Sequence, residues 1–554
     1  MGRVLTALAS TAAVIRHQRG GALRAGGRKL PNVLGVGFIT AAYAALYSFY
    51  LLTLHATMRD GLADVGEYDQ AVSGYAHLTG PHSPFVGMAN AQDPGALQLS
   101  DHFTPLLALL APGYRIHDGP QTLLIETAIL AALPIIPLWL FTRRAAGESR
   151  GFGTAAAYLV VIGYGVTWPI QMALWFEFHE VFLALPIMMW MLERAQAGRL
   201  RQAASISLLL LLVKDDMGFV IAVFGVYLAA KDTGPRQWAG LVRRTAGDRR
   251  APLRALLRRD RWALLALVPL GIGMVELVNN VLLPYFGGAP ARNFTYTEFG
   301  ATQGQALHAM MSDPSRVLAT LNDSPLKRQT IEMLLWPVLG MCLLSPITLL
   351  ALPLLLERFL SVNQLYWVMP YHYNAFLVPI MFCGGVDGAV RLSRRLASPA
   401  SSGLRVRWPG SPLRGHGWVA RGVLITLFCA WVASSAWLTA MRYPMKHLTD
   451  AAYRNTSTSD IVAAHAAAAH MPRGVLVAAA TQVGPQLLDR DKVIMWSIPG
   501  DRDYPDTPWV LADVQRASYP FSSVDAQKSD VQWMLTEGYR IVFQDDGWVV
   551  LHRP

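Results

Sequence analysis

The sequence predicts an all-α polytopic membrane protein with a small extracytoplasmic α/β domain at its C-terminal end. The chain has 554 residues, of which 53% are hydrophobic and only 15% charged, and its mean hydropathy of +0.30 is typical of a membrane protein. Apolar runs long enough to cross a bilayer recur between residues 34 and 441. Residues 442–554 contain no such run, and their short apolar stretches alternate with turn residues.

Basic residues are concentrated in three segments, and this indicates the orientation of the chain. Residues 1–33 contain six Lys/Arg and no acid, residues 231–261 contain ten basic and three acidic residues, and residues 391–421 contain seven basic residues and no acid. Because cytoplasmic loops carry the excess of Lys and Arg, all three segments are predicted to be cytoplasmic. Membrane orientation thus explains the net charge of +11, and no nucleic-acid partner is predicted.

Fixing these segments in the cytoplasm determines the remaining topology. The membrane domain, residues 34–441, is predicted to cross the bilayer about eleven times, with a first outer loop at 56–119 and a second at 285–333. Residues 103–114 are too short to cross and are predicted to re-enter or to lie along the interface. Single spans are predicted at 34–55, 120–141, 152–172, 180–195, 262–284, 374–391 and 420–441.

Two regions are predicted to form hairpins of short crossing segments. In residues 205–230, Lys214, Asp215 and Asp216 interrupt the apolar run, and each charge costs about 2.5–3.5 kcal/mol at mid-membrane. Two short helices that meet at the outer face avoid most of that cost. Residues 334–362 must also cross twice to keep the parity, with a turn near Ser345-Pro346.

The C-terminal part, residues 442–554, is predicted to be a separate α/β domain outside the plasma membrane. Residues 451–471 resemble a helix, and 475–479, 493–496 and 509–514 resemble buried strands. The chain ends in a predicted hairpin with Asp-Gly at its turn. The Ala-, Arg- and Gly-rich composition of the whole chain suggests a bacterial protein.

A set of ionisable residues at the ends of predicted spans maps to the outer face. Their convergence suggests a site that borders the membrane, although polar residues also collect wherever helices leave a bilayer. The residues concerned are Asp64, Glu67, Asp69, Asp101, His102, Glu177, His179, Glu180, Lys214, Asp215, Glu357, Arg358 and His372.

The stretch GLADVGEYDQAVSGY, residues 61–75, places three carboxylates directly after the first span. On a helix Asp64 and Glu67 share a face, while Asp69 lies about 140° from Asp64. A bend at the glycines would turn both aspartates inward, and a solvated loop is the alternative to a site. Such a carboxylate can deprotonate a hydroxyl or bind a divalent cation.

Other motifs exclude several kinds of chemistry. Residues 178–180, FHE, contain one histidine without an HExxH pattern or a second histidine four residues away, so no metal site is predicted. No phosphate-binding loop, dinucleotide fingerprint or nucleophile elbow stands between a strand and a helix. Lys214 and Arg358 could supply positive charge to a phosphate.

Five stretches, taken in order, resemble the domain-of-unknown-function family 2079. They are DVGEYDQ (64–70), HFTPLLALLAPGY (102–114), FHE (178–180), LLLVKDDMG (210–218) and PYHYNAFLVPIMF (370–382). The similarity extends from about residue 40 to 390, and the C-terminal domain resembles the extracytoplasmic tail of such proteins. Ala63 and Asp101 depart from the family pattern, but neither removes a chemical group.

The resemblance implies a relation to the type-C (GT-C) glycosyltransferases, which use sugars carried on polyprenyl phosphate. It implies a GT-C-like fold and an inverting transfer to an extracytoplasmic glycan, lipid or protein. Asp64 and Asp69 match the carboxylates that act as base or metal ligand in the first outer loop, and a divalent cation is allowed. Expected contacts to the donor or sugar are His102, His179, Glu180, Lys214, Asp215, Arg358 and His372.

Two other functions are compatible with the sequence. A transporter or flippase of a lipid-linked or anionic solute would use the same buried charges without making a bond, although no inverted repeat is evident. A non-catalytic envelope scaffold would bind cell-wall partners through its outer domain, and the charged residues would then be structural.

Overall fold

The computed structural model describes residues 32–89, 95–147, 151–231, 262–288, 294–397, 416–496 and 507–554. Most of each basic segment lies outside these residues, namely 1–31, 232–261 and 398–415. Their predicted cytoplasmic placement therefore stays a prediction.

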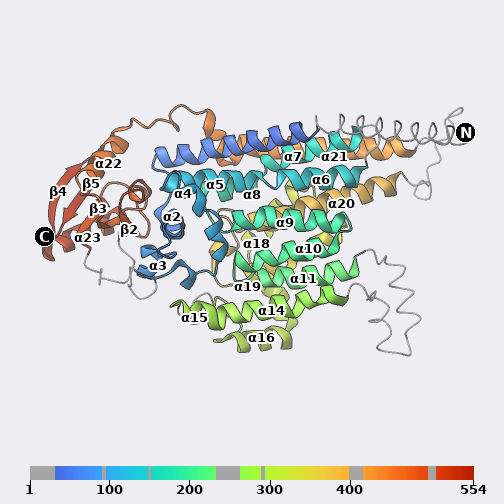
Figure 1. The fold of residues 1–554 in the computed structure, drawn as a ribbon, viewed down its shortest axis with the longest axis horizontal. Helices are drawn as coiled ribbons and strands as arrows, with labels where there is room; N and C mark the ends of the chain where they lie inside the picture. The colour runs from blue at the N-terminus through green and yellow to red at the C-terminus, as the bar shows by residue number, and fades with distance from the viewer. Residues whose placement is uncertain are drawn as a thin grey trace, which may run out of the picture.

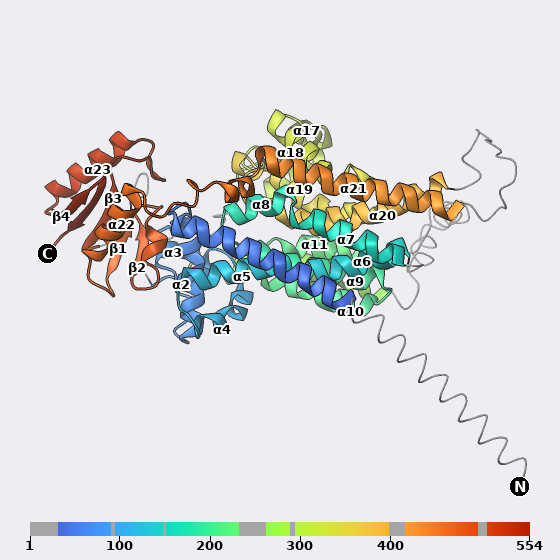
Figure 2. The same cartoon turned by 90° about the horizontal axis from the view of Figure 1, so that it is seen from above.

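The molecule is elongated, with a bundle of helices along its long axis and a sheet domain at one end (Figure 1). Turning the view by 90° leaves the same separation of the two parts (Figure 2). Short helices from the first outer loop, among them α2 and α3, lie between the bundle and the sheet domain.

Six helices among the described residues are long and apolar enough to cross a membrane. The chain is therefore a multi-pass membrane protein, and six of the predicted single spans coincide with them. They are Asn32–Ala56, Pro120–Ala146 (α5 Pro120–Ala132 and α6 Ile135–Ala146), Phe152–Trp175 (α7 Phe152–Gly165 and α8 Trp168–Trp175), Ala263–Tyr285 (with α14 Leu267–Leu277 and α15 Leu283–Tyr285), Ala375–Leu396 (with α20 Val378–Leu396) and Gly417–Arg442 (within α21 His416–Arg442).

Shorter helices occupy the first predicted hairpin and the segment before it. Helix α9, Val181–Gln196, has 16 residues. It is followed by α10, Leu200–Ser207, whose axis continues through the 3-10 turn Leu208–Leu212, and then by α11, Met217–Ala230. Lys214 lies in the break between α10 and α11. Residues 205–230 are thus two short helices, as the cost of burying charge predicts.

The second predicted hairpin is built from short turns. Segments η7 (Trp336–Val338), η8 (Met341–Leu344) and η9 (Pro346–Ala351) lead into α19 (Leu352–Leu360). The chain turns at Ser345 as predicted, and the Ser345 hydroxyl donates to Asp387 over 2.7 Å, midway along α20. No helix in this region is long enough to span a bilayer, so the total of about eleven crossings stays a prediction.

Short helices and 3-10 turns occupy much of the two predicted outer loops and of residues 325–377. They are α2 (Leu62–Ala76), α3 (Pro84–Ala89), η1 (Gln98–Ser100), η2 (Pro105–Leu109), α4 (Ala111–Tyr114), α16 (Gln303–Ser312), α17 (Pro314–Thr320), α18 (Pro325–Leu335), η10 (Gln364–Tyr366) and η11 (Ala375–Leu377). Residues 103–114 form two such pieces, in keeping with the prediction that they do not cross the membrane.

The C-terminal domain is an α/β sheet with strand order β2-β1-β3-β5-β4. Strand β1 pairs in parallel with β2 and β3, whereas β5 is antiparallel to β3 and β4. All predicted strands are present, but α23 was not predicted. The elements are α22 (Ser459–Ala469), β1 (Leu476–Ala479), β2 (Lys492–Met495), β3 (Trp509–Asp513), α23 (Val524–Thr536), β4 (Arg540–Asp545) and β5 (Trp548–His552).

Helix α2 packs against both parts of the molecule. Leu62 and Val65 belong to the hydrophobic core of the C-terminal domain, whereas Tyr68 belongs to the core of the bundle. The Gln70 side chain donates to the Val493 carbonyl over 3.1 Å and accepts from the Val493 amide over 3.2 Å. The position of α2 is therefore set by the bundle and the C-terminal domain together.

Candidate active site

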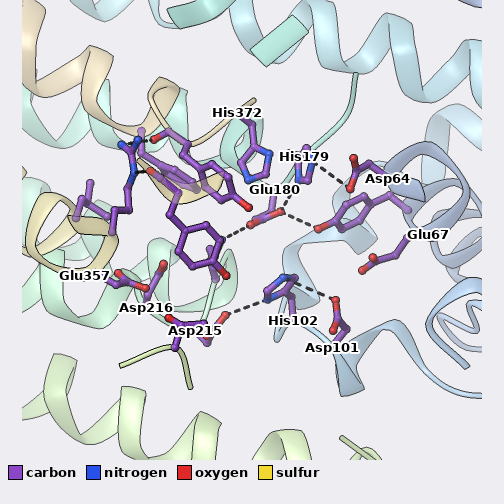
Figure 3. Close-up of a pocket in the computed structure, with 18 of the residues that line it drawn as sticks. Asp64, Glu67, Asp101, His102, His179, Glu180, Asp215, Asp216, Glu357 and His372 are labelled. Carbon is purple, nitrogen blue, oxygen red and sulfur yellow. Dashed lines mark hydrogen bonds and ion pairs between the residues drawn. The ribbon is translucent and has the colours of Figure 1, made fainter. Parts of the chain in front are cut away.

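A cavity of about 210 Å³ lies where the bundle meets α2. Its walls come from segments far apart in the sequence, and carboxylates, imidazoles and two permanent cations face it (Figure 3). The lining residues are Asp64, Glu67, Tyr68, Asp101, His102, His179, Glu180, Lys214, Asp215, Asp216, Thr295, Tyr296, Leu354, Glu357, Arg358, Tyr366, His372, Tyr373 and Phe376.

Eight of the nine site residues predicted from the sequence line this cavity. The structure does not bring Asp69 to it. The eight are Asp64, His102, His179, Glu180, Lys214, Asp215, Arg358 and His372.

Asp64 and Glu67 project from the same side of α2, as their spacing predicts. Asp64 lies in the first turn of the helix, where the helix dipole favours a negative charge, and its side chain is 22% exposed. Glu67 is buried and accepts a long hydrogen bond of 3.4 Å from Gln98. Burial, together with Asp101, raises the pKa of Glu67 to about 8. Asp64 is thus the more accessible of the two carboxyl groups.

Asp69 faces away from the cavity, and this corrects its predicted place in the site. Gly66 lies inside the regular helix α2, so no bend turns both aspartates inward. The Tyr114 hydroxyl donates to Asp69 Oδ1 over 2.6 Å. Burial raises the pKa of Asp69 to about 7, although this hydrogen bond opposes the shift.

His179 stands between two carboxylates. Its Nε2 lies 3.2 Å from Asp64 Oδ1, and its Nδ1 lies 3.4 Å from Glu180 Oε2. Burial disfavours the charged ring, but Asp64 and then Glu180 outweigh it and raise the pKa of His179 to about 9.

Lys214 reaches the cavity from the break between α10 and α11 and holds Glu180. Its Nζ lies 2.8 Å from Glu180 Oε1, and both side chains are largely buried. The Tyr68 hydroxyl donates to Glu180 Oε2 over 2.7 Å. Glu180 is therefore fixed from two sides, and the charge that interrupts the apolar hairpin has a partner.

His102 carries a second positive charge into the cavity. Its Nδ1 lies 3.4 Å from Asp215 Oδ1 and its Nε2 lies 3.7 Å from Asp101 Oδ2. Burial opposes protonation, but Asp101 and Asp215 raise the pKa of His102 to about 10. The ring is an imidazolium at neutral pH.

The side chain of Arg358 is hydrogen-bonded to the loop of residues 366–374. The guanidinium donates to the carbonyls of Tyr366 and Tyr373 over 2.8 and 3.2 Å, and to Asn374 Oδ1 over 3.0 Å. Three of its five donors therefore position the loop that carries His372. Arg358 lines the cavity as predicted, but these bonds leave it fewer donors for a ligand.

His372 is placed over His179 by an unusual backbone. Tyr371 has φ +74°, a left-handed conformation that costs about 1–2 kcal/mol in a residue with a Cβ atom. The rings of His372 and His179 stack with centroids 3.4 Å apart. Burial and the neighbouring His179 lower the pKa of His372 well below its usual range.

The sequence prediction missed several lining residues. Tyr68, Asp216 and Tyr373 lie inside quoted motifs, so a closer reading of DVGEYDQ, KDD and PYHY could have included them. Glu357 was noted on the outer face but was not assigned to the site. Thr295 and Tyr296 carry no signal in the sequence, because their place in the wall depends on the fold of 294–299 against α19.

A comparison against protein families identifies the family of the chain. Residues 55–550 match the family described as "Predicted membrane protein (DUF2079)". The chain belongs to this family. The resemblance recognised in the sequence is thus confirmed, and the DUF2079 match extends through the C-terminal domain.

Solved structures resemble the DUF2079 chain only at low identity. ArnT from Cupriavidus metallidurans bound to undecaprenyl phosphate is 13% identical, with a TM-score of 0.43 over 93% of this chain and 98% of that chain. The archaeal oligosaccharyltransferase AglB from Archaeoglobus fulgidus, in complex with an inhibitory peptide and a dolichol-phosphate, is 13% identical, with a TM-score of 0.36 over 86% of this chain and 69% of that chain. These scores are too low to carry an argument about function. A search of curated proteins found no significant match.

Proposed function

We propose that the protein is a membrane glycosyltransferase that transfers a sugar from a polyprenyl-phosphate donor to an extracytoplasmic acceptor with inversion. Asp64 is the general base for the acceptor hydroxyl. The observation that carries this proposal is the common cavity of Asp64, Lys214 and His102. Direct displacement at an anomeric carbon needs a base on one side and positive charge for the departing phosphate on the other.

Asp64 suits the role of base better than its neighbours do. It is partly exposed to the cavity, whereas Glu67 holds its proton at neutral pH because of burial. Asp69 supports α2 from behind through Tyr114 and takes no part in the reaction. Lys214 and His102 supply positive charge for the leaving phosphate.

The position of helix α19 supports access of a lipid-linked donor from the bilayer to the cavity. Leu352 and Leu356 on this helix are exposed, at 47% and 38%, whereas Leu354, Glu357 and Arg358 line the cavity. Exposed apolar side chains on a membrane helix face lipid tails. An apolar surface directly beside a charged cavity fits a donor with a hydrocarbon chain and an anionic headgroup.

The charges at the far end of the bundle support an extracytoplasmic site. Helices α9 and α20 begin beside the cavity and end in Arg194 and in Arg394 and Arg395. Helix α6 ends at the same place, because Arg144 Nη2 lies 2.6 Å from Glu193 Oε1. Because Lys and Arg are in excess on the cytoplasmic side, this cluster of basic helix ends supports a cavity, α2 and C-terminal domain on the outer side and an extracytoplasmic acceptor.

Substitution of Asp64 tests the proposed reaction. Full-length protein in lipid nanodiscs is given a panel of radiolabelled polyprenyl-phosphate sugars and envelope extract as acceptor. We expect Asp64→Asn to lower the transfer rate by about 10²–10⁴-fold. Asp118→Asn is the matched control, because Asp118 lies in the same outer loop, is 42% exposed and does not line the cavity. Equal rates for wild type and Asp64→Asn would overturn the assignment of the base.

The same preparation separates transfer from transport. Vesicles that contain the wild-type protein and a lipid-linked donor are assayed for movement of the headgroup across the bilayer. Movement that Asp64→Asn leaves unchanged, without transfer from any donor in the panel, would favour a flippase over the glycosyltransferase proposed here.

A further inference from the structure

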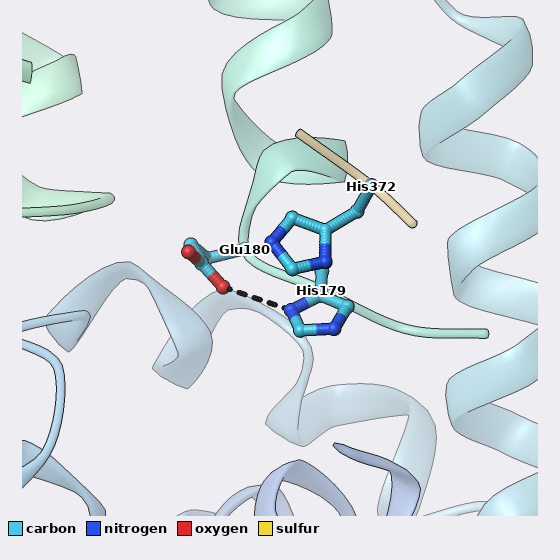
Figure 4. A group of neighbouring side chains, drawn as sticks. All are labelled: His179, Glu180 and His372. Atoms are coloured by element: carbon cyan, nitrogen blue, oxygen red, sulfur yellow. Dashed lines mark hydrogen bonds and ion pairs between the residues drawn. The ribbon is translucent and has the colours of Figure 1, made fainter. Parts of the chain in front are cut away.

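Two imidazoles and one carboxylate meet in the wall of the cavity. His179, Glu180 and His372 each offer one ligand atom, and the three atoms lie within 4.8 Å of one another. All three side chains are buried. Figure 4 shows the two rings and the carboxylate gathered around a common space. Two histidines and one glutamate are a ligand set that proteins use for zinc.

The spacing of these atoms is compatible with a shared metal ion. His179 Nδ1 and Glu180 Oε2 are 3.4 Å apart, which is long for a hydrogen bond. Two ligands of a tetrahedral zinc ion, each about 2.0–2.1 Å from the metal, are separated by roughly 3.4 Å. This one distance therefore fits two ligands of a zinc ion, and the third ligand atom lies within 4.8 Å of both.

His372 has an unsatisfied group that points to a ligand. The residue is 4% exposed, and its Nδ1 has no hydrogen-bond partner. A buried polar atom without a partner costs about 1–3 kcal/mol and requires an explanation. The left-handed backbone of Tyr371, which places the ring over His179, adds to that cost. An ion bound at the edge of the two stacked rings, where one nitrogen of each ring lies near Glu180, would give this buried imidazole a partner.

The surroundings have the features of an outer shell around a metal. A histidine that binds a metal through one ring nitrogen usually donates from the other to a carboxylate. Asp64 Oδ1 lies 3.2 Å from His179 Nε2, on the side of the ring away from Glu180. Tyr68 and Lys214 hold the Glu180 carboxylate over 2.7 and 2.8 Å. Two of the three ligand side chains are thus already oriented.

We propose that His179, Glu180 and His372 bind one Zn²⁺ ion. Three protein ligands leave the fourth position of a tetrahedral ion open, and here that position can take water or an anionic oxygen from a substrate. No sequence motif predicts the site, because the two histidines come from segments far apart in the chain and not from one helix. Zinc binding does not depend on the proposed transfer reaction and is measured separately from it.

Metal content of the purified protein tests the site. Full-length protein with an affinity tag free of histidine is stripped with a chelator, incubated with Zn²⁺, desalted and measured by plasma mass spectrometry. We expect about one zinc ion per wild-type chain and its loss in His372→Ala and His179→Ala. His102→Ala is the matched control, because His102 lines the same cavity but does not belong to the cluster, and this variant should keep its zinc.

Two further measurements distinguish binding from a general effect on folding. Asp64→Asn should keep the three ligands but weaken zinc affinity about 10–100-fold. X-ray absorption at the zinc edge should show two imidazole ligands in the wild-type protein. This measurement needs no variant, so it does not depend on whether a variant folds. Failure of the wild type to retain zinc after desalting, zinc without imidazole ligands, or full zinc content in a folded His372→Ala would each overturn the proposal.

Discussion

Asp64 Oδ1 lies 3.2 Å from His179 Nε2, which joins the first turn of α2 to the segment that precedes α9. Asp64 follows the first span and His179 belongs to the FHE motif, and His179 has a second partner on the cavity wall. His179 continues the contact to Glu180, and Glu180 to Lys214. The proposed base and the proposed phosphate contact are thus the two ends of one chain of charged groups.

The Asp64–His179 contact predicts that the two residues act as a unit. Asp64→Asn and His179→Gln should each lower the proposed transfer rate by about 10²-fold or more, and the double variant should be no slower than the slower single variant. Residues that share one interaction show such non-additivity. Initial rates of all four proteins at saturating donor check this. Losses that multiply in the double variant would mean that the two side chains act separately.

The raised pKa of Asp69 predicts that the stability of the folded protein depends on pH. Burial raises its pKa in the folded protein to about 7, above the ordinary value of 3.8. Between about pH 4 and 7 the unfolded chain releases this proton while the folded chain keeps it, so stability falls as the pH rises through this window and is flat above it. The contribution is on the order of a few kcal/mol.

Asp69→Asn removes this titration while an amide oxygen still accepts the hydrogen bond of Tyr114. The melting temperature of the variant minus that of the wild type should therefore increase between pH 5 and pH 8. Melting curves in detergent at four pH values measure the difference. A difference that is the same at every pH would mean that Asp69 is already ionised in the folded protein throughout this range.

The buried pair of Lys214 and Glu180 predicts a large loss of stability when only one partner is removed. Their side chains are 12% and 1% exposed, so Lys214→Met leaves an uncompensated carboxylate and should cost about 3–5 kcal/mol. Lys214→Met/Glu180→Gln should recover part of this loss. Denaturation in the presence of a chelator isolates the effect from metal binding.

A pair in the C-terminal domain provides the control for Lys214. Arg516 Nε lies 2.7 Å from Asp513 Oδ2, and the Arg516 side chain is 34% exposed. Arg516→Met should cost less than Lys214→Met, because water screens the guanidinium and the amides of Gln515 and Arg516 still donate to Asp513. Equal losses for Lys214→Met and Arg516→Met would show that burial does not strengthen the inner pair.

The membrane architecture could be predicted from composition, because the bilayer imposes the length and apolarity of a span. The same topology predicts His102, His179 and His372 on one face, and all three line the cavity. The number of crossings was harder to predict. The hairpin around Ser345 is built from 3-10 turns that reach only the middle of α20, and hydropathy does not distinguish such turns from short helices.

Side-chain direction and long-range contacts determine how much of the site could be predicted from the sequence. The angular separation of Asp64 and Asp69 predicts opposite faces of a helix, but a bend at Gly66 was an alternative. The packing of α2 between two hydrophobic cores excludes this bend. The loss of Arg358 donors to backbone carbonyls and the stacking of His372 on His179 arise from tertiary structure. Neither has a local signature in the sequence.

Close packing of α11 and α14 predicts opposite effects for two neighbouring glycines. A Cβ atom at Gly271 would lie 2.2 Å from the Gly218 carbonyl oxygen, and one at Gly218 would lie 2.2 Å from the Gly271 carbonyl oxygen, whereas Gly273 has nothing within 4 Å. Small residues allow membrane helices to approach this closely. Gly271→Ala should therefore push the helices apart and cost about 1–3 kcal/mol, while Gly273→Ala should gain about 0.5–1 kcal/mol from helix propensity.

Melting temperatures of the two alanine variants in the same detergent measure this contrast. Gly218→Ala should match Gly271→Ala, because the contact is reciprocal. Helix α11 begins directly after Asp216, so separation of the two helices should also displace the segment that carries Lys214 and lower the proposed transfer rate. Equal stability of Gly271→Ala and Gly273→Ala would mean that α11 and α14 do not pack at these glycines.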